Sequence, residues 1–124
     1  MLVFPDNDKP LYVDADASHL RCRAMLYQYE TTHTSKLLLR FMAHVFTAAA
    51  LKWSTIEEDC YALVKAFNTF ENLLLGRIFI VRTDHRNLLW MQHSINAKVQ
   101  RWFAYLYIFE FTLEHIPGYH IYRK

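Results

Sequence analysis

Three aspartates stand where predicted elements begin or end, and together they could hold divalent cations. Asp16 follows a segment of alternating apolar residues, Asp59 lies in the first turns of an amphipathic segment, and Asp84 follows a β-branched run. Gathered carboxylates repel one another, and hard cations with oxygen ligands, above all Mg²⁺, relieve that repulsion. Two such ions about 3.5–4 Å apart can activate a water molecule and stabilise the leaving oxygen in phosphodiester hydrolysis. The acids predict such a site if the fold brings them to one edge of a sheet.

Each acid also has an ordinary structural interpretation. Asp16 can simply end a strand, and Asp84 can cap a short helix predicted over residues 85–91. Asp59, with Glu57 and Glu58 beside it, can complement the helix dipole, an effect of about 0.3–1 kcal/mol for each charge. Spacing alone leaves both interpretations open.

The clearest structural pattern runs from residue 54 to residue 81. Ser54 and Glu57 have the spacing of a capping box, and Gly76 is placed to end the helix in the left-handed region. The unbroken apolar run at 78–81 predicts a strand buried on both faces. Helical spacing defines one apolar stripe, formed by Ile56, Cys60, Leu63, Val64, Phe67 and Leu74.

The remaining segments complete an α/β order of elements. We expect a lead-in over residues 1–10, strands over 11–15, 23–29 and 36–46, the helix from Ser54, the strand at 78–81, a helix over 94–108 and a last strand over 111–116, followed by a turn at 117–118. Residues 48–51 are also compatible with a helix. Hairpins first and crossovers later imply a mixed sheet, antiparallel at one side and parallel at the other. Ligands in such sheets bind at the carboxyl ends of strands.

Composition narrows the class of protein. A chain of 124 residues with 53% hydrophobic residues makes one domain with a substantial core. A net charge of +2 does not by itself predict nucleic-acid binding. Cys22 and Cys60 have neither disulfide nor metal spacing, which favours a reducing compartment. No signal peptide and no apolar run of about 18 residues is present, so we expect a soluble intracellular protein, cytoplasmic or nuclear, without membrane contact.

Four segments carry a family resemblance. They are DADAS at 14–18, STIEEDCYALVKAF at 54–67, LLGRIFIVRTDHRNLLW at 74–90 and INAKVQRWFAYLYIFEFTLEHIPG at 95–118. Together they resemble the RNase H-like domain of retrotransposon reverse transcriptases, most closely the Gypsy type with long terminal repeats. The resemblance implies a five-stranded mixed sheet flanked by helices. It also implies an endonuclease, a hydrolase that cleaves the RNA strand of an RNA–DNA hybrid, in a polyprotein whose RNA-directed DNA polymerase is a nucleotidyltransferase.

The resemblance also implies roles and partners. Asp16, Asp59 and Asp84 match the positions of catalytic acids that hold two Mg²⁺ ions, for which Mn²⁺ can substitute. The implied partners are the RNA–DNA hybrid, recognised through its shape and 2′-hydroxyls, and the polymerase domain. A small-molecule substrate is not expected.

The chain departs from the family pattern at three places. Asp59 stands where the family has glutamate, which draws the carboxylate back by roughly 1.5 Å, and Glu58 points about 100° away. Arg21 and Arg23 stand where glycine is common. The family continues past Pro-Gly to a fourth acid, so we expect the domain over 11–124 to lack its C-terminal helix. These departures keep open a catalytically impaired remnant, acting as a structural or nucleic-acid-binding module, or a marginally folded fragment that exposes apolar surface.

Other residue types carry weaker signals. Basic side chains can track a phosphate backbone or form a solvated face, and the candidates are Arg21, Arg23, Arg82, Arg86, Lys98 and Arg101. Trp53, Trp90 and Trp102 can stack on bases or belong to the core. His85 can assist proton transfer or lie unused at the surface. The seven histidines show no zinc-binding spacing.

Overall fold

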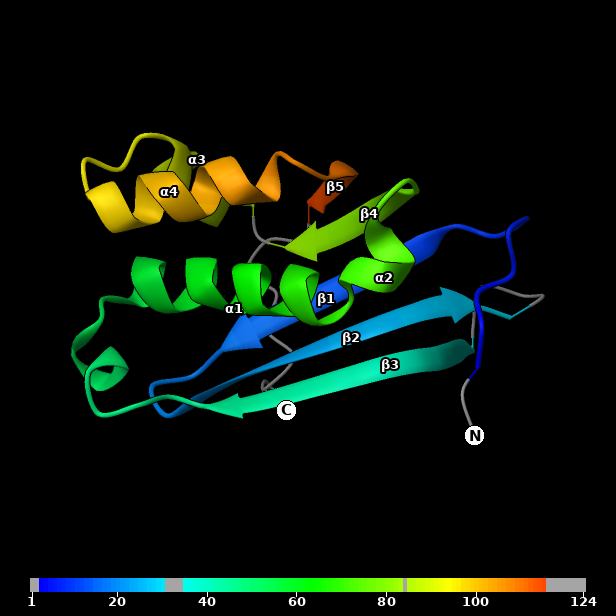
Figure 1. The fold of residues 1–124 in the computed structure, drawn as a ribbon, viewed down its shortest axis with the longest axis horizontal. Helices are drawn as coiled ribbons and strands as arrows, with labels where there is room; N and C mark the ends of the chain where they lie inside the picture. The colour runs from blue at the N-terminus through cyan, green and yellow to red at the C-terminus, as the bar shows by residue number, and fades with distance from the viewer. Residues whose placement is uncertain (1–2, 31–34, 84, 116–124) are drawn as a thin grey trace.

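The sheet has five strands and mixed direction. In the computed structural model the described residues are 3–30, 35–83 and 85–115, with the backbone alone for 85–88 and 115. The sheet order is β3-β2-β1-β4-β5, formed by β1 (Leu11–Ala17), β2 (Arg21–Tyr29), β3 (Lys36–Val45), β4 (Ile78–Thr83) and β5 (Glu110–His115). The first three strands pair antiparallel, whereas β4 runs parallel to both β1 and β5. The predicted mixed sheet, including its third strand, is confirmed (Figure 1).

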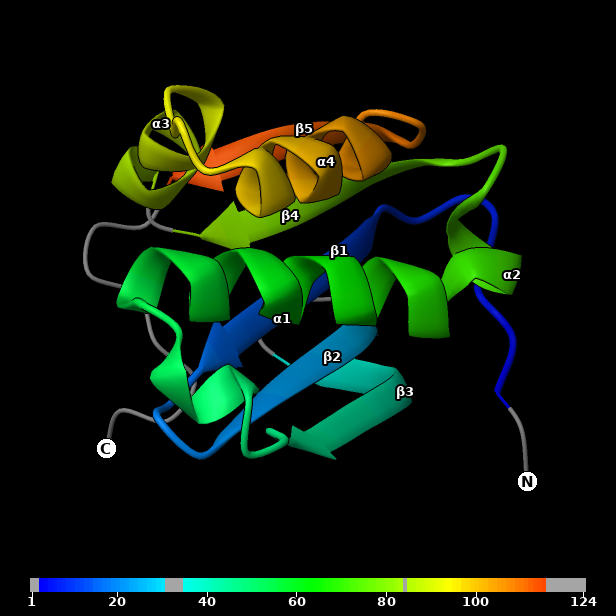
Figure 2. The same cartoon turned by 60° about the vertical axis from the view of Figure 1, so that its left-hand side comes forward.

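The helices form a layer over one face of this sheet. They are the 3₁₀ turn η1 (Ala50–Lys52), α1 (Thr55–Thr69), α2 (Glu71–Leu74), α3 (His85–Gln92) and α4 (Ala97–Leu106). The longest, α1, packs on β1 and β2, and α3 and α4 pack beside it (Figure 2). None of the helices in the described part of the chain is long and apolar enough to cross a membrane.

The start of α1 has the capping box that the sequence predicts. The Ser54 hydroxyl accepts the Glu57 backbone N–H at 3.3 Å, and the Ser54 N–H donates to Glu57 Oε1 at 2.9 Å. This reciprocal capping box satisfies two amides that a helix end leaves without partners. Gly76 has φ +81°, the left-handed conformation predicted for the residue that ends the helical segment.

The predicted single helix from Ser54 to Gly76 is interrupted at Phe70. There φ is −97° and ψ is 12°, so α1 ends and the short α2 begins. The Phe70 carbonyl accepts the N–H groups of Leu73 and Leu74 at 2.9 and 3.1 Å, which restarts the helix. Both Phe70 and Leu74 are buried, so the break turns two large apolar side chains into the core.

An aromatic group lies at the centre of the core between α1 and the parallel strands. Phe67 makes edge contacts with Phe79, Phe109 and Phe111, with ring centroids 5.1–5.5 Å apart. Such pairs add about 0.5–1.5 kcal/mol beyond the area that they bury. Phe67 belongs to the stripe predicted from helical spacing, and it is fully buried.

Two further predictions about element details are wrong. The strand at 78–81 is not buried on both faces, because Ile78 is 69% exposed and alternate residues are only half-buried. The described helices cover one face only, and therefore burial alternates along β4. The helix predicted from Ser94 begins at Ala97, because Asn96 Oδ1 accepts the N–H groups of Lys98 and Val99 at 2.8 and 3.3 Å.

The segment before β1 is tied to β2. Gln28 is 1% exposed, and its amide oxygen accepts the Asp6 N–H at 2.9 Å. Its amide nitrogen donates to the carbonyls of Asp6 and Lys9 at 2.8 and 3.0 Å. One side chain therefore fixes the entry of the chain into the sheet.

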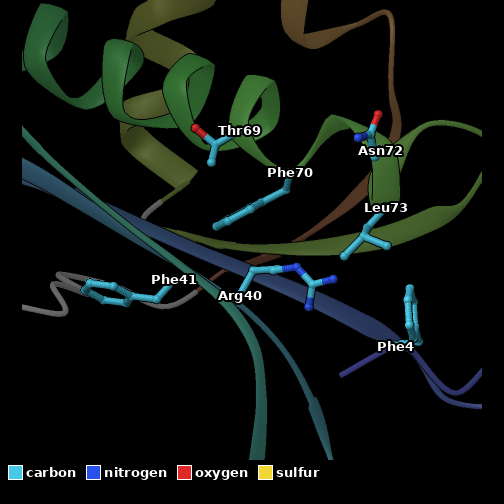
Figure 3. Close-up of a pocket in the computed structure, with 7 residues that line it drawn as sticks. All are labelled: Phe4, Arg40, Phe41, Thr69, Phe70, Asn72 and Leu73. Atoms are coloured by element: carbon cyan, nitrogen blue, oxygen red, sulfur yellow. The ribbon is translucent and has the colours of Figure 1, made fainter. Parts of the chain in front are cut away.

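Strand β3 forms one edge of the sheet and carries exposed apolar side chains. Leu38, Phe41 and Val45 are all exposed there. A cavity of about 410 Å³ lies beside this strand, between Phe4 of the lead-in and the junction of α1 with α2 (Figure 3). Arg40 lines it and donates from Nη1 to the carbonyls of Val3 and Leu39 at 2.7 Å each. The cavity adjoins the C-terminal end of α1, whereas Asp59 lies in the first turns of that helix.

Candidate active site

Asp16 lies at the carboxyl end of β1, the central strand. It is 5% exposed, and its Oδ1 accepts the Ala17 N–H at 2.9 Å. The strand β1 lies between antiparallel β2 and parallel β4, and Asp16 is opposite Arg23 of β2. The carboxylate is thus held at a strand end of the kind where α/β sheets bind ligands.

Asp59 belongs to the side of α1 that faces the sheet. Ala62, Leu63 and Ala66, which follow it by three, four and seven residues, are all buried. Residues at this spacing share one helix face, so Asp59 begins the sheet-facing stripe. Asp59 itself is half-buried at the N-terminal end of that stripe.

The two acids lie toward the same end of the molecule. Figures 1 and 2 both show the arrowheads of β1 and β4 pointing toward the end at which α1 begins. By strand alternation Asp16 shares the sheet face with Asp14, opposite the helices, whereas Asp59 approaches from the helix layer. Joint ligation therefore requires the two carboxylates to meet around the end of the strand.

Asp84 lies outside the described residues. In the parallel pairing of β1 with β4, the last pair of opposite residues is Asp14 and Arg82. In the sequence, Asp16 and Asp84 each follow a member of that pair by two residues. Over the part of the chain that the structure describes, no three His, Cys, Asp or Glu side chains form a metal-binding group.

Glu58 is a buried acid whose position the sequence interpretation missed. It is 7% exposed, and its Oε2 lies 3.6 Å from His19 Nδ1, in the turn after Asp16-Ala17-Ser18. Burial raises the pKa of Glu58, the nearby His19 opposes that rise, and Glu57 adds to it. Its spacing of four from buried Ala62 is the sequence signal that could have placed it.

Glu57 and Lys98 join α1 to α4. Glu57 Oε2 lies 2.8 Å from Lys98 Nζ and accepts Asn96 Nδ2 at 3.2 Å. The Lys98 hydrogen bond and the Ser54 N–H hold the pKa of Glu57 below its ordinary value. Lys98 Nζ also lies 4.6 Å from the Trp53 ring centroid, so its charge is used within the fold.

The predicted nucleic-acid-binding residues fall into distinct groups. Arg82 and Lys98 make ion pairs inside the domain, with Glu114 and Glu57 respectively. Arg23 is half-buried, and the Arg86 side chain lies outside the described atoms. Arg21 and Arg101 are exposed. The geometry therefore leaves Arg21 and Arg101 as the accessible candidates for phosphate contacts among the described side chains.

The tryptophans also divide into half-buried and exposed side chains. Trp53 and Trp102 meet edge-on at 5.2 Å and, half-buried, both contact Tyr61. Trp90 on α3 is exposed.

Cys22 and Cys60 are buried free thiols, and burial raises their pKa values to about 11 and about 12. The predicted core position of the Cys60 thiol is confirmed.

Comparison with solved structures identifies the fold as RNase H-like. A foamy viral protease-reverse transcriptase in complex with dsDNA superposes with a TM-score of 0.77 at 21% identity, over 96% of this chain and 26% of that one. The same kind of protein in complex with RNA/DNA hybrid gives a TM-score of 0.72 at 22% identity, over 97% and 17%. LC11-RNase H1 in complex with RNA/DNA hybrid gives 0.58 at 12% identity, over 89% and 86%.

The family follows from sequence. The model of the RNase H-like domain found in reverse transcriptase matches residues 6–109, and the chain belongs to this family. It is 33% identical over 121 residues to the Retrovirus-related Pol polyprotein from transposon 297 of Drosophila melanogaster, covering 95% of this chain and 11% of the relative. The corresponding polyprotein from transposon 412 is 31% identical over 120 residues, with 95% and 10% covered. The chain thus spans about a tenth of the length of these relatives.

Proposed function

We propose that this chain is the RNase H domain of a Gypsy-type retrotransposon polyprotein and that it hydrolyses the RNA strand of an RNA–DNA hybrid. The observation that supports this function best is that the end of β1, which carries Asp16, and the start of α1, which carries Asp59, lie toward one end of a fold shared with reverse-transcriptase RNase H-like domains. Two of the solved relatives are complexes with RNA/DNA hybrid.

The residues present suit a hard divalent cation. Asp16 and Asp59 offer carboxylate oxygens, the donors that Mg²⁺ and Mn²⁺ prefer. Beside them, Glu58 Oε2 is buried, lies 3.6 Å from His19 Nδ1 and accepts no hydrogen bond from the described residues. The carboxylate oxygens at this end of the domain are therefore donors of the type that a divalent cation would bind. In the proposed site Asp16, Asp59 and Asp84 would hold the cations, which would supply activation of water and stabilisation of the leaving oxygen.

The protein's own residues supply position and recognition. The Ala17 N–H fixes one oxygen of Asp16, and the Ser54–Glu57 capping box fixes the first turn of the helix that carries Asp59. Exposed Arg21 and Arg101 are placed to contact phosphates, whereas base identity is not read. In a complete polyprotein the polymerase domain would be the covalent partner.

An impaired remnant is the second candidate, and two observations favour it. Asp59 is shorter than the glutamate of the family by about one bond, and an error of about 1 Å costs on the order of 10²-fold in rate. Arg82 and Lys98 form ion pairs within the domain. A module that binds hybrid without cutting it fits these observations.

The test is cleavage of a labelled RNA–DNA hybrid by the purified chain in Mg²⁺ or Mn²⁺. Cleavage should be abolished by Asp84→Asn and by Asp16→Asn and retained by Asp8→Asn, a matched change at an exposed acid of the lead-in. Hybrid binding without cleavage by the unaltered chain supports the remnant. Equal cleavage by all variants would show that a contaminating nuclease is responsible.

A further inference from the structure

Every strand contributes to a polar cluster on the sheet face opposite the helix layer. We call it the back-face cluster, and it consists of Asp14 of β1, Tyr27 and Tyr29 of β2, Lys36 of β3, Arg82 of β4 and Glu114 of β5. The strand registers agree with these contacts, since Arg82 is opposite both Asp14 and Glu114. Residues directly opposite on neighbouring strands point to the same face. The cluster therefore crosses the whole width of the sheet.

Arg82 is the centre of the cluster. Its Nη1 donates to the hydroxyl oxygens of Tyr29 and Tyr27 at 2.9 and 3.1 Å. Its Nε lies 2.9 Å from Glu114 Oε1. The Tyr27 hydroxyl in turn donates to Asp14 Oδ1 at 2.9 Å. The planar guanidinium thus links β4 to β2 and β5 directly and to β1 through Tyr27.

Burial makes these contacts consequential. Asp14 and Tyr27 are fully buried, and a carboxylate without water needs hydrogen-bond donors and nearby positive charge. Tyr27 supplies one donor, and Lys36 Nζ lies 3.8 Å from Asp14 Oδ2. Burial raises the pKa of Tyr27, and the Asp14 carboxylate raises it further, so the hydroxyl keeps its proton.

The cluster adjoins the proposed site through β1. Asp14 precedes Asp16 by two residues, on the same strand and the same face. We propose that Arg82 is a positioning residue, which through Tyr27 and Asp14 holds the end of β1 against β4 and fixes the Asp16 carboxylate. This inference rests on the proposed function, in which Asp16 holds a divalent cation, and it assigns Arg82 a role other than phosphate binding.

A single hydroxyl tests the link. Tyr27→Phe removes the hydroxyl that accepts from Arg82 and donates to Asp14, and it keeps the ring. Tyr12→Phe is the matched control, because the Tyr12 ring stacks on Tyr27 at 5.3 Å and its hydroxyl makes no hydrogen bond with the described residues. The local readout is hydrogen exchange at the Ala17 amide, which donates to Asp16. The second readout is Mn²⁺ affinity by calorimetry.

Tyr27→Phe should speed Ala17 exchange at least tenfold and weaken Mn²⁺ binding at least fivefold, while amides in α1 keep their rates and Tyr12→Phe changes neither quantity. Arg82→Gln, the second variant, should repeat these effects. Equal Ala17 exchange in Tyr27→Phe and Tyr12→Phe, uniform acceleration at all amides, or unchanged Mn²⁺ affinity beside tight wild-type binding would overturn the inference. If the wild type binds Mn²⁺ no better than Asp16→Asn, the proposed function fails, and Ala17 exchange still decides whether Arg82 holds Asp16.

Discussion

Lys98 Nζ lies 2.8 Å from Glu57 Oε2, and this contact joins the first turn of α1 to the first turn of α4. Both side chains are largely shielded from water, at 32% and 15% exposure. The same ammonium group lies over the Trp53 ring. This ion pair holds α1 and α4 together at the end of the domain where Asp59 lies.

Lys98→Met should lower the free energy of unfolding by about 1 kcal/mol, since it removes a partly buried ion pair and keeps most of the side-chain volume. Urea unfolding at low salt measures the loss. The matched control is Lys52→Met, at an exposed lysine of η1, which should change stability little. The difference between the two variants should shrink in about 1 M salt, where charges are screened within about 3 Å. A salt-independent difference would contradict an electrostatic origin.

Gln28→Leu should destabilise the domain by about 1–3 kcal/mol. The substitution leaves backbone groups of residues 6 and 9 without the partners that Gln28 supplies. Chemical denaturation measures the effect, and amide exchange near Asp6 should rise with it. Gln92→Leu, at an exposed glutamine of α3, is the control. Equal stability of the two variants would mean that the lead-in contributes nothing to folding.

The thiols should react slowly until the domain unfolds. Burial raises the pKa of Cys22 to about 11, so at pH 8 very little of it is thiolate in the folded chain. A folded pKa above the unfolded value of about 8.5 gives stability that is full below pH 8.5 and is lost as the pH rises through 11. Cys22→Ala should therefore flatten the alkaline fall in stability. Alkylation rates with and without urea, measured between pH 7 and 10, check both statements, and rapid labelling of the folded chain would contradict them.

Asp59→Glu should raise hybrid cleavage by roughly 10-fold to 10²-fold, because it extends the carboxylate toward the strand end by about one bond. The measurement is kcat on a labelled hybrid in Mg²⁺. Asp59→Asn, which keeps the length and removes the charge, should abolish cleavage. If Asp59→Glu is no faster than the unaltered chain, the length of the side chain does not limit the reaction.

Local rules predicted the features that depend on neighbours in sequence. The Ser54–Glu57 cap and the left-handed Gly76 follow from short-range geometry. The start of α4 shows the limit of such rules. Ser94 and Asn96 are both good caps, and the Ser94 hydroxyl instead accepts the Asn96 N–H at 3.1 Å. The break at Phe70 depends on how that side chain packs in the core, which the spacing of apolar residues alone does not predict.

Partners distant in sequence are a second limit of such rules. Arg82 and Lys98 are candidates either for phosphate contacts or for a solvated face, and in the structure they lie next to Glu114 and Glu57, 32 and 41 residues distant along the chain. The sequence shows which residues are charged, but it does not show which strand or helix will pack opposite them. The motifs, by contrast, predict the positions of Asp16 and Asp59 in the elements, near the end of β1 and in the first turns of α1, and these two element ends lie toward one end of the fold.

The position of β3 at the edge of the sheet has a practical consequence. Among the described residues it pairs with another strand on one side only, and it carries the exposed Leu38, Phe41 and Val45. Such an edge invites strand pairing between molecules, which grows with concentration. Kinetic work on this chain therefore calls for dilute samples and a dilution series, so that a fall in specific activity through self-association is not mistaken for a weak enzyme.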